Sequence, residues 1–322
     1  MRLSTSMIYQ QNLSSITNAY SKWQTTGVQL ATGMRVNSPA DDPIASSQAI
    51  GLQNSQALGT QYSAARSNAT ASVSLETTVV SQVTDVIHAI QTKLVQAGDG
   101  TLSDKDRQSL STTLQSYKDQ LLSLANSKDG NGNYIFAGYK TDTAPFVADA
   151  TTGAVSYVGG TKAISQKVDD SSEMTIGDTG DQVFTHLSAG YTVEPDGSAS
   201  ESNIFNSIDT ALGALNTPQE DADAATTAAY SADMGKAARG MTNSLNNMLT
   251  VQSSLGSKLN QLDALNSVGT DRSTIYETRI SDLTGADWYS TVSDYSLQQV
   301  ALQAAYSTFN SMQKLSLFQT NS

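Results

Sequence analysis

Apolar residues recur at alternating intervals of four and three along the first thirty residues of the chain. Their positions are Tyr9, Leu13, Ile16, Tyr20, Trp23, Gly27 and Leu30. This heptad spacing is typical of a narrow helical stripe that packs against a partner helix. Gly33 accepts the left-handed backbone conformation without a Cβ penalty, so we expect the first helix to end there.

A loop follows, and the residues at its end predict the start of a second helix. Asp42 is a favourable N-cap residue, and Pro43 suits the first helical position. The pattern then remains helical from about Ile44 to Ala97. Its apolar stripe contains Val73, Val80, Val83, Ile87, Ile90 and Leu94.

Glycines at positions 98 and 100 interrupt this pattern, and a third helix begins a few residues later. Ser103 and Asp106 resemble a weak capping box, with Asp in place of the usual Glu or Gln. The stripe of this helix contains Leu110, Leu114, Tyr117, Leu121 and Leu124. We expect the second and third helices to form a hairpin that buries both stripes together.

The composition changes after a turn cluster at residues 130–133. Short runs of β-forming residues, separated by Gly, Asp and Ser, predict a small β-rich domain over residues 133–202. The candidate strands are Val155–Val158, Ile164–Val168, Met174–Ile176 and Val183–Phe184.

Helical periodicity returns near Ile204 and continues to the end of the chain. The clearest stripe of this part contains Met241, Leu245, Met248, Leu255, Leu259 and Leu262. A last helix is expected to begin near Asp287, with a stripe of Tyr295, Leu302, Ala305, Phe309 and Met312. The two ends of the chain therefore mirror each other across the β-rich insert.

The predicted fold is mainly α, with long antiparallel coiled-coil helices from both termini and a small outer β domain. We expect a terminal coiled-coil segment of residues 1–43 and 286–322, disordered in the monomer. A helical bundle of residues 44–132 and 203–285 would carry the outer domain of residues 133–202. The terminal stripes supply the candidate assembly interface, which consists of Tyr9, Leu13, Ile16, Tyr20, Trp23, Leu30, Tyr295, Leu302, Ala305, Phe309 and Met312.

The distribution of charge supports segments that become covered at both ends. The 322-residue chain has a formal net charge of -12, but only 15% of its residues are charged. Residues 1–40 and 294–322 contain very few of these charges, whereas residues 163–235 are strongly acidic. Such acidity disfavours binding to nucleic acid and to anionic membrane surfaces. No apolar run approaches the ~20 residues that span a bilayer, and no cleavable signal is visible.

Residue types that carry chemistry are sparse. There is no cysteine, and only His88 and His186 could serve as histidine ligands or bases. Asp41 and Asp42 are better interpreted as a turn and a cap than as a metal site or an acid–base pair. The glycines near position 160 lack the Lys-Ser/Thr of a phosphate loop. We therefore expect no enzyme and no cofactor.

Two motifs resemble those of the flagellin family. Residues 29–43, Gln-Leu-Ala-Thr-Gly-Met-Arg-Val-Asn-Ser-Pro-Ala-Asp-Asp-Pro, resemble its N-terminal signature, and residues 302–306 with 315–318 resemble its C-terminal counterpart. Residues 104–125 resemble the inner helical hairpin. The similarity covers both ends of the chain, about two thirds of its length. It marks a signature loop whose members are Gly33, Arg35, Asn37, Asp41, Asp42 and Pro43.

Other motifs resemble the members of this family that act at the hook–filament junction. They are residues 131–138, residues 143–146, Pro43 and the first five residues. Ala31-Thr32 and Gln319-Thr320 depart from the usual pattern, and neither departure falls on an apolar stripe. The resemblance implies a ring of subunits between a hook-side junction protein and flagellin. It also implies an extracellular location, export by the flagellar type III apparatus and a cytoplasmic chaperone at the C-terminal helix.

Two alternatives share parts of this pattern. A filament flagellin would have the same fold, and the short insert and residues 134–138 argue against it. A tip or translocator protein of a type III secretion system also uses helical hairpins. The absence of a membrane-length apolar run argues against the translocator.

Overall fold

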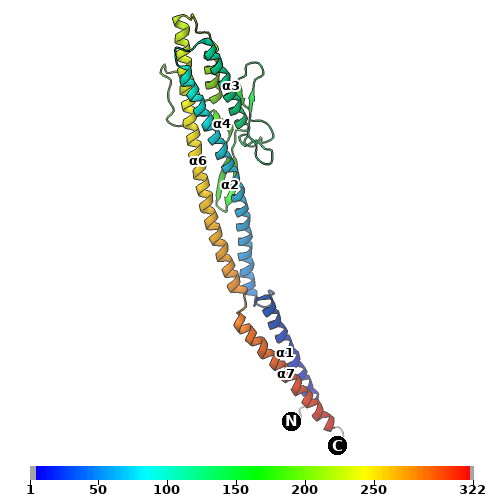
Figure 1. Ribbon diagram of the computed structural model, residues 1–322. Helices are drawn as coiled ribbons and strands as arrows, with labels where there is room; N and C mark the ends of the chain where they lie inside the picture. The colour runs from blue at the N-terminus through cyan, green and yellow to red at the C-terminus, as the bar shows by residue number, and fades with distance from the viewer. Residues whose placement is uncertain (1–4, 320–322) are drawn as a thin grey trace. The chain divides into compact units, whose positions relative to one another are not determined.

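The structure is a computed structural model that describes the backbone of residues 5–319 and the side chains of residues 7–311. Long helices dominate it, with two small antiparallel sheets in the middle of the chain (Figure 1). The helices are α1 (Thr5–Thr32), α2 (Pro43–Ala97), α3 (Asp104–Ala125), α4 (Gly180–Phe184), α5 (Ile204–Leu215), α6 (Ala224–Thr284) and α7 (Trp288–Gln319). The strands are β1 (Phe146–Ala148), β2 (Val155–Tyr157), β3 (Ile164–Asp169) and β4 (Ser172–Gly177). The predicted mainly α fold with a β-rich insert is confirmed.

The chain divides into two compact units. The terminal unit contains the residues up to Thr60 and those from Gly269 onward, and the central unit contains Gln61–Val268. Helices α2 and α6 contribute residues to both units. The three-part division drawn from the sequence stays a prediction.

Local signals in the sequence account for the observed helix ends. Gly33 has a φ of 70° and donates its N–H to the carbonyl of Gln29, which ends α1. Asp42 accepts a hydrogen bond from the N–H of Ala45 at 3.0 Å and caps α2. Ser103 and Asp106 form both hydrogen bonds of a capping box at the start of α3. The caps and the boundaries predicted for these three helices are confirmed.

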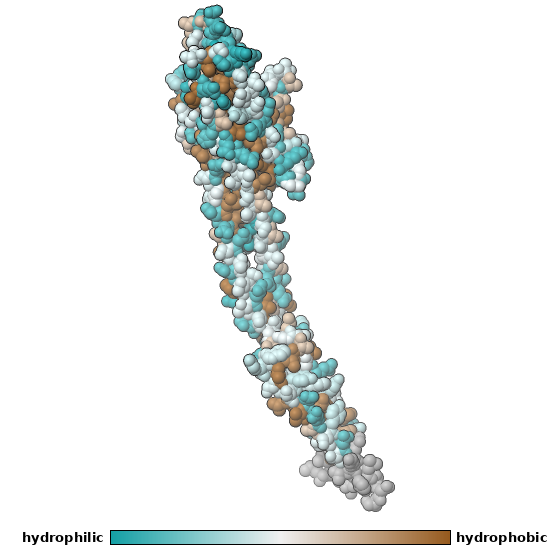
Figure 2. Space-filling view, in the orientation of Figure 1, coloured by the Kyte–Doolittle hydropathy of each residue, from teal (hydrophilic) through white to brown (hydrophobic). Residues whose placement is uncertain are grey.

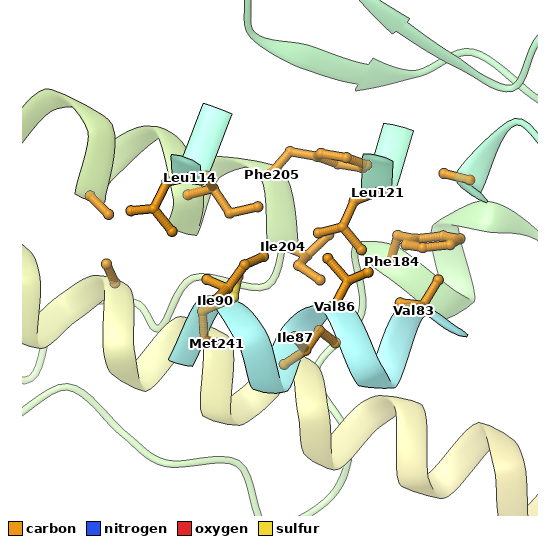
Figure 3. Close-up of a cluster of buried hydrophobic side chains, with 14 of the residues drawn as sticks. Val83, Val86, Ile87, Ile90, Leu114, Leu121, Phe184, Ile204, Phe205 and Met241 are labelled. Carbon is orange, nitrogen blue, oxygen red and sulfur yellow. The ribbon is translucent and has the colours of Figure 1, made fainter. Parts of the chain in front are cut away.

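The core of the central unit joins the stripes of the second, third and sixth helices. Side chains of α2, α3 and α6 pack in one hydrophobic cluster with α4 and α5 (Figure 3). The members labelled in the figure are Val83, Val86, Ile87, Ile90, Leu114, Leu121, Phe184, Ile204, Phe205 and Met241. The helical hairpin therefore buries both of its stripes, as the periodicity predicts.

Four phenylalanines connect the β-rich insert to this core. The ring centroid of Phe184 lies 5.2 Å from those of Phe136 and Phe146, in edge-on geometry. Phe146 lies 5.5 Å from Phe205 of α5. Phe136 and Phe146 belong to the two motifs that resemble junction proteins. These motifs thus supply aromatic side chains to the core of the central unit.

The two sheets are separate hairpin-like pairs. In the first, β1 pairs with β2, and Phe146 lies opposite Tyr157. In the second, β3 pairs with β4 with register shifts at both ends. This β3–β4 hairpin packs Val168 and Met174 against Ala69 and Leu262 in a small second cluster.

The sequence interpretation was wrong for one predicted strand and missed another. Residues 183 and 184 belong to the short helix α4, although they were predicted as a strand. A two-residue apolar run has no period, so it cannot separate a strand from a buried helical turn. Strand β1 was not predicted, because Pro145 stands directly before it and proline usually marks a turn.

A core substitution tests whether this cluster stabilises the central unit. We expect Ile87→Ala, at a fully buried position, to lower the free energy of unfolding by about 2–5 kcal/mol. The matched control is Val95→Ala on the same helix, where the side chain is 79% exposed and the change should stay within about 0.5 kcal/mol. Urea unfolding followed by circular dichroism measures both. Equal losses in the two variants would contradict the assignment of the core.

Candidate assembly interface

The terminal helices α1 and α7 pack against each other, and residues of both predicted stripes meet there. The rings of Trp23 and Tyr295 stack with centroids 5.6 Å apart, and those of Tyr9 and Phe309 lie 5.4 Å apart. Ile16 is buried between the helices. The predicted pairing of the N- and C-terminal helices is therefore confirmed.

A small residue and a polar residue of α1 allow this helix to approach α7 closely near Tyr295. A Cβ added to Gly27 would lie 3.3 Å from the ring of Tyr295, so a glycine leaves the aromatic ring room. The hydroxyl of the preceding residue, Thr26, donates a hydrogen bond to the side-chain oxygen of Gln298 at 2.7 Å. Thr26 is buried, so this contact satisfies a polar group that water does not reach.

The intrachain pairing covers only part of the predicted interface. Tyr9, Leu13 and Tyr20 remain 47–48% exposed. Trp23, Leu30, Tyr295, Leu302, Ala305 and Phe309 are partly covered. Met312 lies in α7, but its side chain is outside the described residues. The α1–α7 pair therefore presents apolar side chains that the described part of the chain covers only in part.

Further exposed apolar residues lie in the same unit but outside the stripes identified from the sequence. Trp288 and Tyr289 at the start of α7 are 59% and 89% exposed. The others include Met7, Val28, Met34, Ile44, Val292, Leu297, Val300 and Tyr306. A heptad count follows one face of each terminal helix, so it missed these residues, and Met34 and Ile44 lie outside both terminal helices. The uncharged character of both chain ends was the signal that could have found them.

The two units differ in how far their apolar side chains are buried. Among the described residues, most of the large exposed hydrophobic side chains belong to the terminal unit. Its buried hydrophobic residues are only Ile16, Val36, Ala45 and Ala49 within the same described part of the chain. Figure 2 shows brown hydrophobic patches on the surface over α1 and α7. Contiguous apolar surface of this kind marks an interaction site.

The signature loop connects α1 to α2 and also contacts the end of α6. The N–H groups of Arg35 and Val36 both donate to the carbonyl of Thr284, at 2.7 and 3.2 Å. In return, the N–H of Ala286 donates to the carbonyl of Gly33 at 2.9 Å. These bonds pair the segment after α1 with the segment that leads into α7.

The guanidinium of Arg35 completes the termination of α6. Its Nη2 donates to the carbonyl of Leu283 at 2.9 Å, and its Nη1 lies 3.2 Å from the carboxylate of Asp42. A cation near the last carbonyls of a helix is favourable because those groups lack partners within the helix. Since Asp42 also caps α2, one ion pair links the start of α2 to the end of α6.

The two adjacent aspartates have different partners in this loop. Asp41 accepts hydrogen bonds from the N–H groups of Asn37 and Ser38 at 3.0 and 2.8 Å. The hydrogen bond from the Ser38 N–H contributes most to lowering the pKa of Asp41. The N–H of Ala45, followed by the guanidinium of Arg35, lowers the pKa of Asp42. Both carboxylates thus fix backbone geometry, which agrees with the interpretation as a turn and a cap.

Residues that could support other chemistry are sparse in the part of the chain that the structure describes. That part contains no group of three or more His, Asp or Glu residues arranged to hold a metal ion. His88 and His186 are both exposed, and they lie on different elements. None of the described helices is long and apolar enough to cross a bilayer.

Comparison with known families explains the arrangement. The profile of the bacterial flagellin N-terminal helical region matches residues 3–141, and that of the C-terminal helical region matches residues 238–319. Flagellar hook-associated protein 3 of Escherichia coli strain K12 is 52% identical over 319 residues, which cover 99% of both chains. The chain belongs to the flagellar hook-associated protein 3 family. Its Salmonella typhimurium member is 51% identical over the full length of both chains.

Solved structures agree with this family assignment at the level of the fold. The hook-associated protein 3 of Legionella pneumophila superposes with a TM-score of 0.64 at 21% identity, covering 74% of this chain and 98% of that one. FlgL of Xanthomonas campestris superposes with a TM-score of 0.60 at 19% identity, covering 71% and 99%. The chain therefore shares its fold with these solved structures over 74% and 71% of its length.

A substitution of Arg35 tests the role of the signature loop. Arg35→Ala should raise amide hydrogen exchange about fivefold at residues 281–288, because one hydrogen bond is worth ~1 kcal/mol. Hydrogen-exchange mass spectrometry of the whole chain measures this change. Lys22→Ala, which removes an exposed cation from α1, is the control and should leave these residues unaffected. An equal effect of both substitutions would show that Arg35 has no specific role at the end of α6.

Proposed function

We propose that this chain is the adaptor at the flagellar hook–filament junction, where a ring of its copies joins a hook-side junction protein to flagellin. A structural role at this junction follows from membership of the hook-associated protein 3 family. The observation that carries the assembly mechanism is the exposed apolar surface of α1 and α7. Neighbouring copies would cover it.

The energetics favour coupling between assembly and the ordering of the terminal helices. Burying one large apolar side chain is worth roughly 1.5–3 kcal/mol, whereas ordering one residue costs about 1–2 kcal/mol of backbone entropy. Side chains such as Tyr289 and Leu297 gain little of this stabilisation in the single chain, because they are 89% and 65% exposed. Contacts with neighbouring subunits would supply the remaining stabilisation, so the helices would become ordered as the ring forms.

A structural role is favoured over catalysis. The family consists of flagellar structural proteins, and the acidic side chains of the signature loop are occupied by backbone N–H groups and Arg35. Their chemistry serves the loop and the helix ends. We infer that the protein acts by assembly and requires no cofactor.

The filament flagellin remains the nearest alternative because it shares the terminal helical regions. Two observations favour the junction. The curated relatives that match the whole chain are hook-associated proteins, and the junction-type motifs place Phe136 and Phe146 in the core of the central unit. A solved relative from Legionella pneumophila is also described as a flagellar junction protein.

Export is proposed to depend on the same terminal segments. An N-terminal region with few charges and few stabilising contacts is easily unfolded and threaded through a narrow channel. We infer that the flagellar type III apparatus exports the chain and that a cytoplasmic chaperone covers the C-terminal helix before export. The assembled protein would then lie outside the cell.

A charge placed in the α7 stripe tests the assembly interface. Leu302→Asp should abolish incorporation into flagella, because assembly would bury an unpaired carboxylate. The free energy of unfolding of the central unit should change by less than about 0.5 kcal/mol. Val95→Asp introduces the same charge at a position of the central unit that is 79% exposed and serves as the control. Normal filaments on cells that carry only Leu302→Asp would refute the proposed interface.

Deletion of residues 1–20 tests the export proposal. The truncated chain should remain in the cytoplasm, and immunoblots of cell and medium fractions measure its distribution. Leu302→Asp is the informative comparison, since a chain that is exported but not assembled should accumulate in the medium. Secretion of the truncated chain at the level of the intact one would show that export does not depend on this segment.

A further inference from the structure

The β3–β4 hairpin is attached to the helices of the central unit by few apolar contacts. Its buried side chains there are Val168 and Met174, which pack against Ala69 of α2 and Leu262 of α6. This cluster is separate from the large core of the central unit. Polar contacts must therefore contribute much of the stability of the hairpin's packing against α2 and α6.

One polar contact is insensitive to pH. Arg66 of α2 is buried, and its Nη1 donates to the carbonyl of Val168 at 3.1 Å. Its Nε donates to the side-chain oxygen of Asn266 on α6 at 2.7 Å. Because a guanidinium keeps its charge at all ordinary pH values, the strength of this contact in the closed form does not change over the range in which carboxyl groups titrate.

Tyr62 of α2 donates a hydrogen bond to Asp170, between β3 and β4, at 3.4 Å. A further polar contact involves Asp178, the residue that follows β4. Its backbone N–H lies 3.3 Å from both carboxyl oxygens of Glu76 on α2. Its carboxylate accepts hydrogen bonds from Nζ of Lys258 on α6, at 3.0 and 3.2 Å. Asp178 thus connects the end of the hairpin to both long helices at once.

The charges at this contact do not balance if both acids ionise. Glu76 is only 2% exposed, and the groups that act on its titration are Asp178 and Lys258. One ammonium group cannot neutralise two carboxylates in a site that water barely reaches. Burial, and then the nearby carboxylate of Asp178, raise the pKa of Glu76 to about 8. At neutral pH Glu76 therefore retains its proton and can donate it in a hydrogen bond to Asp178.

We propose that Glu76, Asp178 and Lys258 form a pH-sensitive clamp that holds the β3–β4 hairpin on α2 and α6. When Glu76 loses its proton to solvent, the carboxylates of Glu76 and Asp178 repel each other, and Lys258 alone cannot neutralise both. Release of the hairpin lets both carboxylates become hydrated. The helices should stay folded, because residues 164–177 contribute no side chain to the large core of the central unit.

The direction of the pH effect follows from the two pKa values of Glu76. In the released hairpin the carboxyl has its ordinary pKa of 4.5, and in the closed form its pKa is about 8. Between these values the closed form binds a proton that the released form has lost. Rising pH therefore favours release, by up to about tenfold for each pH unit, and the effect levels off above pH 8.

Hydrogen-exchange mass spectrometry of the full chain between pH 5.5 and 8.5 tests the clamp. After correction for intrinsic exchange, the opening equilibrium of residues 164–177 should rise by up to about tenfold per pH unit. Residues of the α3 core should show no such rise. Glu76→Gln keeps the shape of the side chain and should remove the pH dependence. Glu173→Gln, an exposed position on the same hairpin, should retain it.

The opposite results would overturn the proposal. They are a hairpin whose opening does not vary with pH, or a Glu76→Gln variant with the same pH dependence as the unmodified chain. If the hairpin of the Glu76→Gln variant does not pack against α2 and α6, the Asp178→Asn variant gives the decisive measurement. It removes the competing carboxylate and leaves Lys258 to act on Glu76 alone, which should lower the pKa of Glu76 and narrow the pH range over which opening rises. An unchanged range would also overturn the clamp.

Discussion

The described part of the terminal unit leaves many large apolar side chains exposed and buries few, and its proposed role rests on this constraint. A helix pair that buries Ile16 but exposes Leu13 and Tyr20 gains only part of the stabilisation its side chains can provide. Ordering two long helices requires more, since each residue loses backbone entropy. Further copies of the same surface would supply the missing contacts. We therefore propose that incomplete burial within one chain is a condition for assembly of this protein.

The family motifs have two distinct structural tasks. The signature loop ends α6 through Arg35, caps α2 through Asp42 and pairs with the segment before α7. It therefore fixes where the terminal helices begin and end. The junction-type motifs instead place Phe136 and Phe146 in the core of the central unit. Because the central unit has its own core, it can remain folded whether or not the terminal helices are in contact with neighbouring subunits.

Much of this organisation could be predicted from the sequence, because long helices carry their period over many turns. The caps at Asp42 and Ser103 and the stripe through Met241 are local or periodic signals, and they predicted the helical frame. The helix α4 was predicted wrongly, since a run as short as Val183–Phe184 has no period. The contact between Glu76 and Asp178 could not be foreseen, because it joins residues that are far apart in the chain. Off-stripe residues such as Tyr289 were missed because a heptad count follows one face only.

The position of this protein in the flagellum can be measured most directly by immunogold electron microscopy of intact flagella, with an antibody against residues 133–202. The account predicts a narrow band of label between the hook and the filament, because a ring of adaptor subunits occupies only that position. Label along the whole filament would contradict the account and would make the chain a filament subunit.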